Sequence, residues 1–252
     1  MAQSDARDLL ENAAFLSSER LLMLGFLVSN KTMNRIPNKW PGRYPAVVRS
    51  IAEMISSLGP RSLNLVHYNT DNKGELGAEL LNVHQLIGGD LDGFQINAAW
   101  PEVVQLYTYV NDCQFVKPRI VLQIGGRAME MKGRDPRLIA AAIDQYRLPG
   151  LEVVTDVLID PSGGLGRPFD PVFARSCLSE IKDRHPECGI GVAGGLTAEN
   201  VDDLVAPLLD EFSMLSIDSE GRLRTPQPDD ALDMEKAQAY LTRSSEMFSS
   251  HL

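Results

Sequence analysis

Glycines, acidic residues and a serine gather at three points of the chain, each directly after a short apolar run. Glycine lets backbone N–H groups approach a ligand because no Cβ intervenes, and clustered N–H donors bind phosphate or carboxylate groups. A tight strand-to-helix turn explains one glycine loop equally well, but two such loops and an acidic third favour an anion site. The residues are Asp160, Gly163, Gly164 and Gly166 after the first run, Gly194 and Gly195 after the second, and Asp218, Ser219 and Gly221 after the third.

Two neighbouring features strengthen this interpretation. Thr197 is expected to be the N-cap of the helix that begins with AENVDDLV, because its hydroxyl can accept a hydrogen bond from an unpaired amide of the first turn. Free N–H groups at a helix N-terminus attract anions. Arg167, in the first glycine loop, would add a guanidinium to the same site.

Apolar strand patterns alternate with helical patterns along the whole chain, which predicts a parallel sheet with helices outside it. In such folds the carboxyl ends of the strands form one face, where ligands bind. Seven strands are counted, one fewer than in a TIM barrel, so the expected fold is a single, incomplete (β/α) barrel domain over residues 1–252. The parts are an N-terminal helix within 1–20, strand and helix units over 21–225 and a C-terminal helix within 226–252; the strands are expected at 21–28, 62–68, 93–98, 119–124, 157–160, 189–193 and 212–218.

Composition excludes several classes of protein. The net charge of −10 argues against a nucleic-acid surface, and no apolar run is long enough to cross a membrane. The three cysteines, Cys113, Cys177 and Cys188, are far apart and have no disulfide or metal spacing, as expected of reduced thiols in a cytoplasmic protein. No metal or other cofactor is predicted.

The stretch from Val157 onward resembles phosphoribosylanthranilate isomerase, the Amadori-rearranging enzyme of tryptophan biosynthesis. That family ends a strand in Leu-Leu-Asp and follows it with Gly-Gly-x-Gly-Lys-x-Phe-Asp, Gly-Gly-Leu-x-x-Glu-Asn-Val and Asp-x-Ser-x-Gly loops. This chain has LID before GGLGRPFD, then GGLTAENV and DSEG, in the same order. Arg167 replaces the family's lysine and keeps its charge. Glu220 replaces a small residue and brings a carboxylate close to the expected phosphate.

Earlier segments match the family more loosely. LMLGFLVSNKTMNRIP resembles its second strand and loop, and GFQINAAWPE resembles its fourth strand. The family's first strand would then be missing, together with its Lys-x-Cys-Gly motif and the cysteine that acts as general base. None of the three cysteines stands at that position.

The resemblance implies roles for particular residues. Asp160 corresponds to the general acid and Arg35 to the arginine that binds the substrate, while Asn97 replaces a histidine of the fourth strand. Asp218 is expected to hold a ribose hydroxyl or loop backbone. The base is left open between His67 and Asp71, and for His67 an ordinary core or rim position is the alternative.

Three functions remain open from the sequence. The first is an isomerase that rearranges a phosphorylated aldose amine to a ketose, and the second is a lyase or aldolase for a phosphorylated sugar on the same scaffold. The third is a barrel that binds a phosphorylated metabolite without catalysis. All three expect a phosphorylated small molecule as partner, and they leave a monomer and a homodimer as alternatives.

Overall fold

Seven parallel strands curl into an incomplete α/β barrel in the part of the chain that the structure describes. This computed structural model describes residues 3–11, 20–58, 62–114, 117–161 and 169–251. Neighbouring strands pair in chain order, with β1 and β9 at the two edges of the sheet. The expected incomplete barrel is confirmed. The strands are β1 (Leu22–Ser29), β2 (Ser62–Asn69), β3 (Gly93–Asn97), β4 (Arg119–Gly125), β7 (Asp156–Asp160), β8 (Gly189–Ala193) and β9 (Ser216–Asp218).

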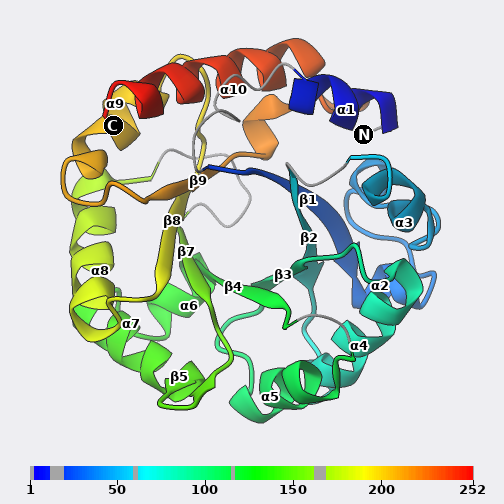
Figure 1. Ribbon diagram of the computed structural model, residues 1–252, viewed down its shortest axis with the longest axis horizontal. Helices are drawn as coiled ribbons and strands as arrows, with labels where there is room; N and C mark the ends of the chain where they lie inside the picture. The colour runs from blue at the N-terminus through cyan, green and yellow to red at the C-terminus, as the bar shows by residue number, and fades with distance from the viewer. Residues whose placement is uncertain (1–2, 12–19, 59–61, 115–116, 162–168, 252) are drawn as a thin grey trace.

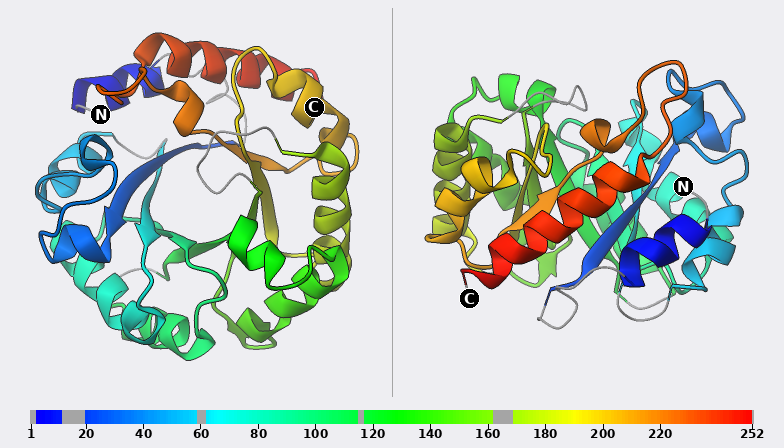
Figure 2. Two further views of the ribbon diagram at one scale, coloured as in Figure 1. Left: turned by 180° about the vertical axis from the view of Figure 1, so that it is seen from behind. Right: turned by 90° about the horizontal axis from the view of Figure 1, so that it is seen from above.

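Helices surround these strands (Figure 1), and the side view shows them as an outer layer around the sheet (Figure 2). Among the described residues, no helix is long and apolar enough to cross a membrane. A two-stranded hairpin of β5 (Arg147–Leu148) and β6 (Leu151–Glu152) lies outside the barrel sheet. The helices are α1 (Gln3–Glu11), α2 (Asn30–Met33), α3 (Ser50–Ile55), α4 (Leu76–Ile87), α5 (Val103–Asp112), α6 (Gly126–Glu130), α7 (Pro136–Ile143), α8 (Pro171–Arg184), α9 (Val201–Leu209) and α10 (Met234–Ser249).

Capping residues explain where several helices begin. Asp135 accepts hydrogen bonds from the first amides of α7, with Pro136 at the first helical position, an arrangement typical of a helix start. Asp170 and Pro171 begin α8 in the same way. The prediction for Thr197 is wrong: α9 begins only at Val201, and the N-cap position is held by Asn200.

Apolar runs do not always continue a helix or a strand, because turns contain them too. Residues 44–58 have an amphipathic pattern typical of a helix, but only α3 forms within them, since residues after Pro45 form tight turns closed by hydrogen bonds from Ser50 N to Val47 O and from Ile51 N to Val48 O. The last strand begins at Ser216 rather than 212, because the residues before it form a turn. The described part of the N-terminal helix ends at Glu11.

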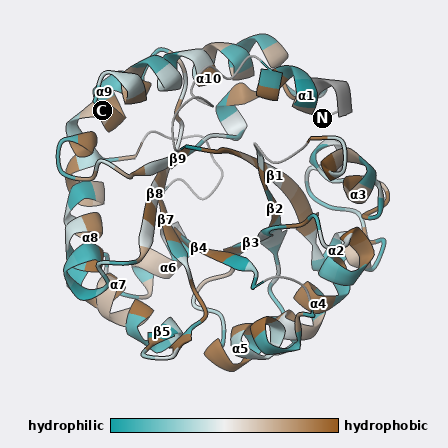
Figure 3. Cartoon of the chain, in the orientation of Figure 1, coloured by the Kyte–Doolittle hydropathy of each residue, from teal (hydrophilic) through white to brown (hydrophobic). Residues whose placement is uncertain are grey.

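Strand register divides the barrel into an apolar and a polar half. The outward-facing strand residues pack beneath the helices as one large core, and those helices carry both hydrophobic and hydrophilic residues (Figure 3). Inside, a small apolar cluster of Leu65, Val121, Leu158 and Ala193 fills the floor. Because inward positions recur every second residue, the inward residues nearer the strands' carboxyl ends are His67, Gln95, Gln123, Asp160 and Asp218.

The seam between β9 and β1 has no strand pairing among the described residues. Arg20 joins its two sides: Nη1 donates to Leu215 O at 2.9 Å and Nη2 donates to Ser213 O at 2.5 Å. Its guanidinium lies 3.8 Å from the ring centroid of Phe248 in α10. Helices α10 and α1 lie side by side outside this seam (Figures 1 and 2), so they cover the two edges of the seven-stranded sheet.

Removing the guanidinium of Arg20 tests this closure. Arg20→Met should lower the free energy of unfolding by roughly 1.5–3 kcal/mol, the contribution of hydrogen bonds from a charged donor. Arg137→Met is the control, since that side chain is 83% exposed and forms only a surface pair with Glu180. Urea unfolding of the two variants beside the wild type gives the comparison, and equal midpoints for all three would contradict the closing role.

Candidate active site at the C-terminal mouth of the barrel

A chain of hydrogen bonds crosses the polar half of the barrel and joins two carboxylates. Gln123 donates from Nε2 to Asp160 Oδ2 at 2.7 Å. Gln95 donates from Nε2 both to Gln123 Oε1 and to Asp218 Oδ2, each at 3.2 Å. The strands β3, β4, β7 and β9 each supply one member, so the chain exists only when the sheet curls. It connects Asp160 and Asp218 through two buried amides.

The surroundings of Asp218 favour its protonated form. Desolvation is the largest effect and raises the pKa of the Asp218 carboxyl group, while the charges of Glu220 and Asp160 act in the same direction. His67 and the hydrogen bond from Gln95 oppose them. Asp218 is therefore a carboxyl group that exchanges protons at higher pH than an exposed aspartate.

Two polar atoms in this mouth have no hydrogen-bond partner among the described residues. They are Nε2 of His67 and Oε1 of Gln95, and both are enclosed. The two residues stand directly opposite one another in the ladder of β2 and β3. Buried polar atoms without partners are costly and uncommon, so their presence beside two carboxylates makes this mouth the candidate site.

A charged cluster covers the mouth on the side of the seam. Arg43, from the loop after β1, donates to both carboxylate oxygens of Asp230 at 2.7 and 3.0 Å and to Glu220 at 3.2 Å. Arg224 binds Asp230 from the other side at 3.1 Å. The carboxylate of Glu220, which the sequence placed unfavourably near a phosphate, is thus compensated by Arg43.

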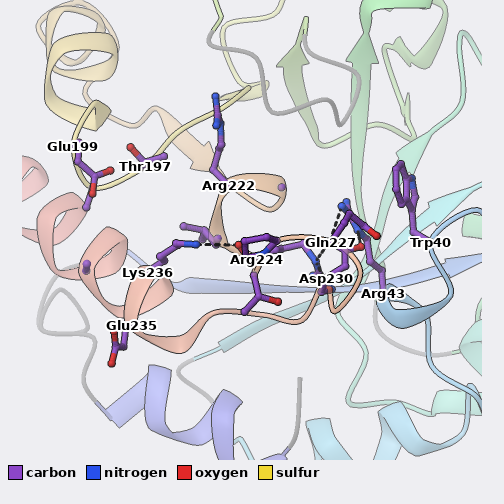
Figure 4. A pocket seen from close by; sticks show the side chains of 16 residues that line it. Trp40, Arg43, Thr197, Glu199, Arg222, Arg224, Gln227, Asp230, Glu235 and Lys236 are labelled. Carbon is purple, nitrogen blue, oxygen red and sulfur yellow. Dashed lines mark hydrogen bonds and ion pairs between the residues drawn. The ribbon is translucent and has the colours of Figure 1, made fainter.

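A cavity of about 860 Å³ opens beside this cluster, at the rim of the barrel. Figure 4 shows Thr197 and Glu199 at one end and Trp40 at the other, with Arg222 between them. Gly221 and Lys236 also line it. The two loops predicted to bind phosphate, after β8 and after β9, therefore both contribute to the wall of this cavity.

The glycine loop after β8 has the backbone geometry that an anion site needs. Gly194 and Gly195 have φ of 127° and 63°, a backbone conformation that side chains disfavour. Asn200 holds the loop by donating to Gly195 O and accepting from Thr197 N. Ser219 donates to Leu196 O at 2.7 Å and so joins the two loops. Gly163, Gly164, Gly166 and Arg167 lie outside the described residues.

The structure brings some predicted residues together and separates others. Asp160, His67 and Asp218 share the mouth, and half-buried Asn97 stands opposite Asn69 at its edge. Asp71 does not share it: its side chain is 99% exposed and faces Arg127 at 3.8 Å. Arg35 lies exposed, with a φ of 56°, after α2.

Gln95 was missed by sequence reasoning, although it occupies an inward position two residues before Asn97. The alternation of strand side chains was the available signal, since it places Gln95 on the same face as Asn97.

The cysteines offer no nucleophile in this mouth. Burial raises the pKa of Cys177 to about 12 and that of Cys188 to about 11. No group of three or more metal-ligating side chains was found among the described residues.

Comparisons with known proteins show the fold alone. No protein-family model matches the chain, and no curated protein matches it. The catalytic domain of a hyperthermophilic chitinase from Pyrococcus furiosus is similar in structure, with a TM-score of 0.54, 12% identity and coverage of 95% of this chain and 90% of that chain. Pyruvate carboxylase from Rhizobium etli is similar at a TM-score of 0.54 and 11% identity over 97% of this chain and 26% of that chain.

The protonation of Asp218 predicts how stability depends on pH. Because its folded pKa is raised, the folded state binds more protons than the unfolded state, and this carboxylate lowers stability as pH rises above the unfolded value of about 4. Asp218→Asn should therefore unfold at higher urea concentration at pH 7, with a gain that shrinks as pH falls toward 4. Asp71→Asn, exposed, should show no such trend; a gain for Asp218→Asn that is independent of pH would contradict the raised pKa.

Proposed function

We propose that this barrel binds a phosphorylated sugar derivative and rearranges an aldose amine to its ketose isomer, in the manner of phosphoribosylanthranilate isomerase. The observation that carries the proposal is the meeting of Asp160 and His67 in one mouth, on either side of Asp218 and the two glutamines. An aldose–ketose rearrangement needs one group that gives a proton and another that takes one. These side chains supply both within a partly enclosed site.

The assigned roles follow from what each group can exchange. Asp160 in its protonated form gives a proton to the ring oxygen, and the sugar ring opens. His67 takes the proton from C2 through its unpaired Nε2, which has no competing partner among the described residues. The resulting enol returns to the keto form when a proton is delivered to C1, so substrate and product are isomers and no further reactant is needed. His67 replaces the cysteine that the resemblance leads one to expect.

The anionic end of the substrate fits the rim of the mouth. The amides of Gly194 and Gly195 and the loop around Gly221 supply N–H donors, and the adjoining cavity carries Arg222 and Lys236. A phosphate held there would place a five-carbon sugar across the barrel toward Asp160. The compensation of Glu220 by Arg43 removes the repulsion that would otherwise oppose it.

The lyase alternative receives less support. Sugar-phosphate lyases of one large class use a lysine amine to form a Schiff base with the substrate carbonyl. None of the seven strands contains a lysine, so no strand supplies such an amine to the mouth.

Anion binding is tested with inorganic phosphate. Gly195→Asp should lower the affinity for phosphate in calorimetry by at least ten-fold, because a carboxylate and a Cβ would occupy the space before the amides. Gly150→Asp is a matched control: Gly150 also has a positive φ, of 79°, but stands in the remote hairpin. Equal affinity in both variants would reject this position for the phosphate.

Proton transfer is tested on phosphoribosylanthranilate with purified protein. Asp160→Asn and His67→Gln should each lower kcat by roughly 10²- to 10⁴-fold, the usual contribution of a general acid or base. Asp71→Asn should leave the rate unchanged because its side chain faces solvent.

If the wild type is active and Asp160→Asn keeps the same kcat, the assignment of Asp160 as the general acid is wrong. A wild type with tight binding of phosphorylated sugar but no turnover would favour a binding protein.

A further inference from the structure

Gln95 connects Gln123 of β4 and Asp218 of β9 through its side-chain nitrogen. Its Nε2 donates to Gln123 and to Asp218 at 3.2 Å each, and the whole residue is only 1% exposed. Its side chain is occupied by Gln123 and Asp218 and presents almost no surface to a ligand in the mouth. Any effect of Gln95 on chemistry must pass through Asp218 and Gln123.

The orientation of the Gln95 amide follows from its neighbours while Asp218 is ionised. Gln123 Oε1 and the ionised Asp218 Oδ2 both face Nε2 and accept hydrogen bonds from it. Turning the amide over would set Oε1 against these two acceptors and remove both hydrogen bonds. With Nε2 facing them, Oε1 is left without a partner among the described residues.

The unpaired oxygen is a cost that comes with the two hydrogen bonds of Gln95. A buried oxygen without a partner is unfavourable, but an apolar side chain would avoid this only by leaving Gln123 Oε1 and Asp218 Oδ2 without their donor. The neighbouring floor of the barrel is filled by the apolar residues Leu65, Val121 and Leu158. The amide of Gln95 therefore stands out from this floor as the group that binds Asp218 and Gln123.

We propose that Gln95 is a positioning residue: its amide fixes the carboxyl group of Asp218 and, through Gln123, that of Asp160, so that the two face one ligand from opposite sides. The two N–H bonds of one planar group link strands that are far apart in sequence. The amide also stabilises the ionised form of Asp218 against the burial that opposes it. The effect on turnover rests on the proposed isomerisation, whereas the effect on the carboxyl groups does not.

Carboxyl titration by ¹³C NMR of aspartate-labelled protein tests this without any substrate. Gln95→Met keeps the length of the side chain and removes the amide, so the midpoint of Asp218 should rise, because a hydrogen bond to its ionised form is lost. The other charged or titratable groups that act on Asp218 stay in place: His67, Asp160 and Glu220, while Tyr240 of α10 faces it from outside the barrel.

Two further variants separate positioning from packing. Gln123→Met leaves the Gln95 bond to Asp218 in place, so it should move the Asp218 midpoint less than Gln95→Met does. Asn64→Leu is the matched control, since Asn64 is also a buried amide whose oxygen lacks a described partner, but it is on the outer face of β2; it should leave the Asp218 midpoint unchanged.

Turnover and stability complete the experiment. Gln95→Met removes the unpaired oxygen of Gln95 but leaves Gln123 Oε1 and Asp218 Oδ2 without this donor, so the urea midpoint should fall modestly. In the same variant kcat on phosphoribosylanthranilate should fall by about a hundred-fold, because the reacting groups are misplaced. An Asp218 midpoint that does not move in Gln95→Met overturns the proposal, as does an equal shift in Asn64→Leu. A wild type without turnover would contradict only the proposed isomerisation. The titrations would still test the role of Gln95.

Discussion

Closing a barrel from seven strands is the constraint on which the rest of this structure depends. A sheet that curls must either pair its last strand with its first or cover both edges. Here β9 is short and no pairing joins it to β1 within the described ranges of the chain, so side chains bridge the seam. Arg20 does this at the amino end of β1, and Arg43 does it at the carboxyl end through Asp230 and Glu220.

The manner of closure shapes the mouth. Because Arg43 reaches across the seam, the loop after β1 lies over the end of β2, and burial raises the pKa of Tyr44 in that loop, with Glu220 adding to the rise. Asp230 accepts from Arg43 and Arg224, and these two guanidinium groups hold the pKa of its carboxyl below the usual range. The same ion pairs that complete the barrel therefore compensate the acidic residues at its rim.

Inside the barrel, burial stabilises the hydrophobic floor but destabilises the charged groups of the polar mouth. Floor residues such as Leu158 gain from burial alone, whereas a carboxyl group at the depth of Asp218 is stabilised only by specific donors. The amide chain supplies those donors but leaves an oxygen of Gln95 and a nitrogen of His67 unpaired. Similarity to a chitinase domain and to part of a carboxylase supports the barrel and no particular chemistry; the chemistry must come from these side chains.

The sequence by itself determined the seven barrel strands, the incomplete barrel that they form and the positions of Asp160 and Asp218 at strand ends. Strand alternation and capping residues such as Asp135 are local signals, and they survive folding because each acts over a few residues. Only the tertiary structure decided that Asp71 faces solvent while His67 faces inward, and that Glu220 meets Arg43. It also joined Gln95 to Asp218, since hydrogen bonds between residues more than a hundred positions apart depend on how the sheet curls rather than on any local pattern.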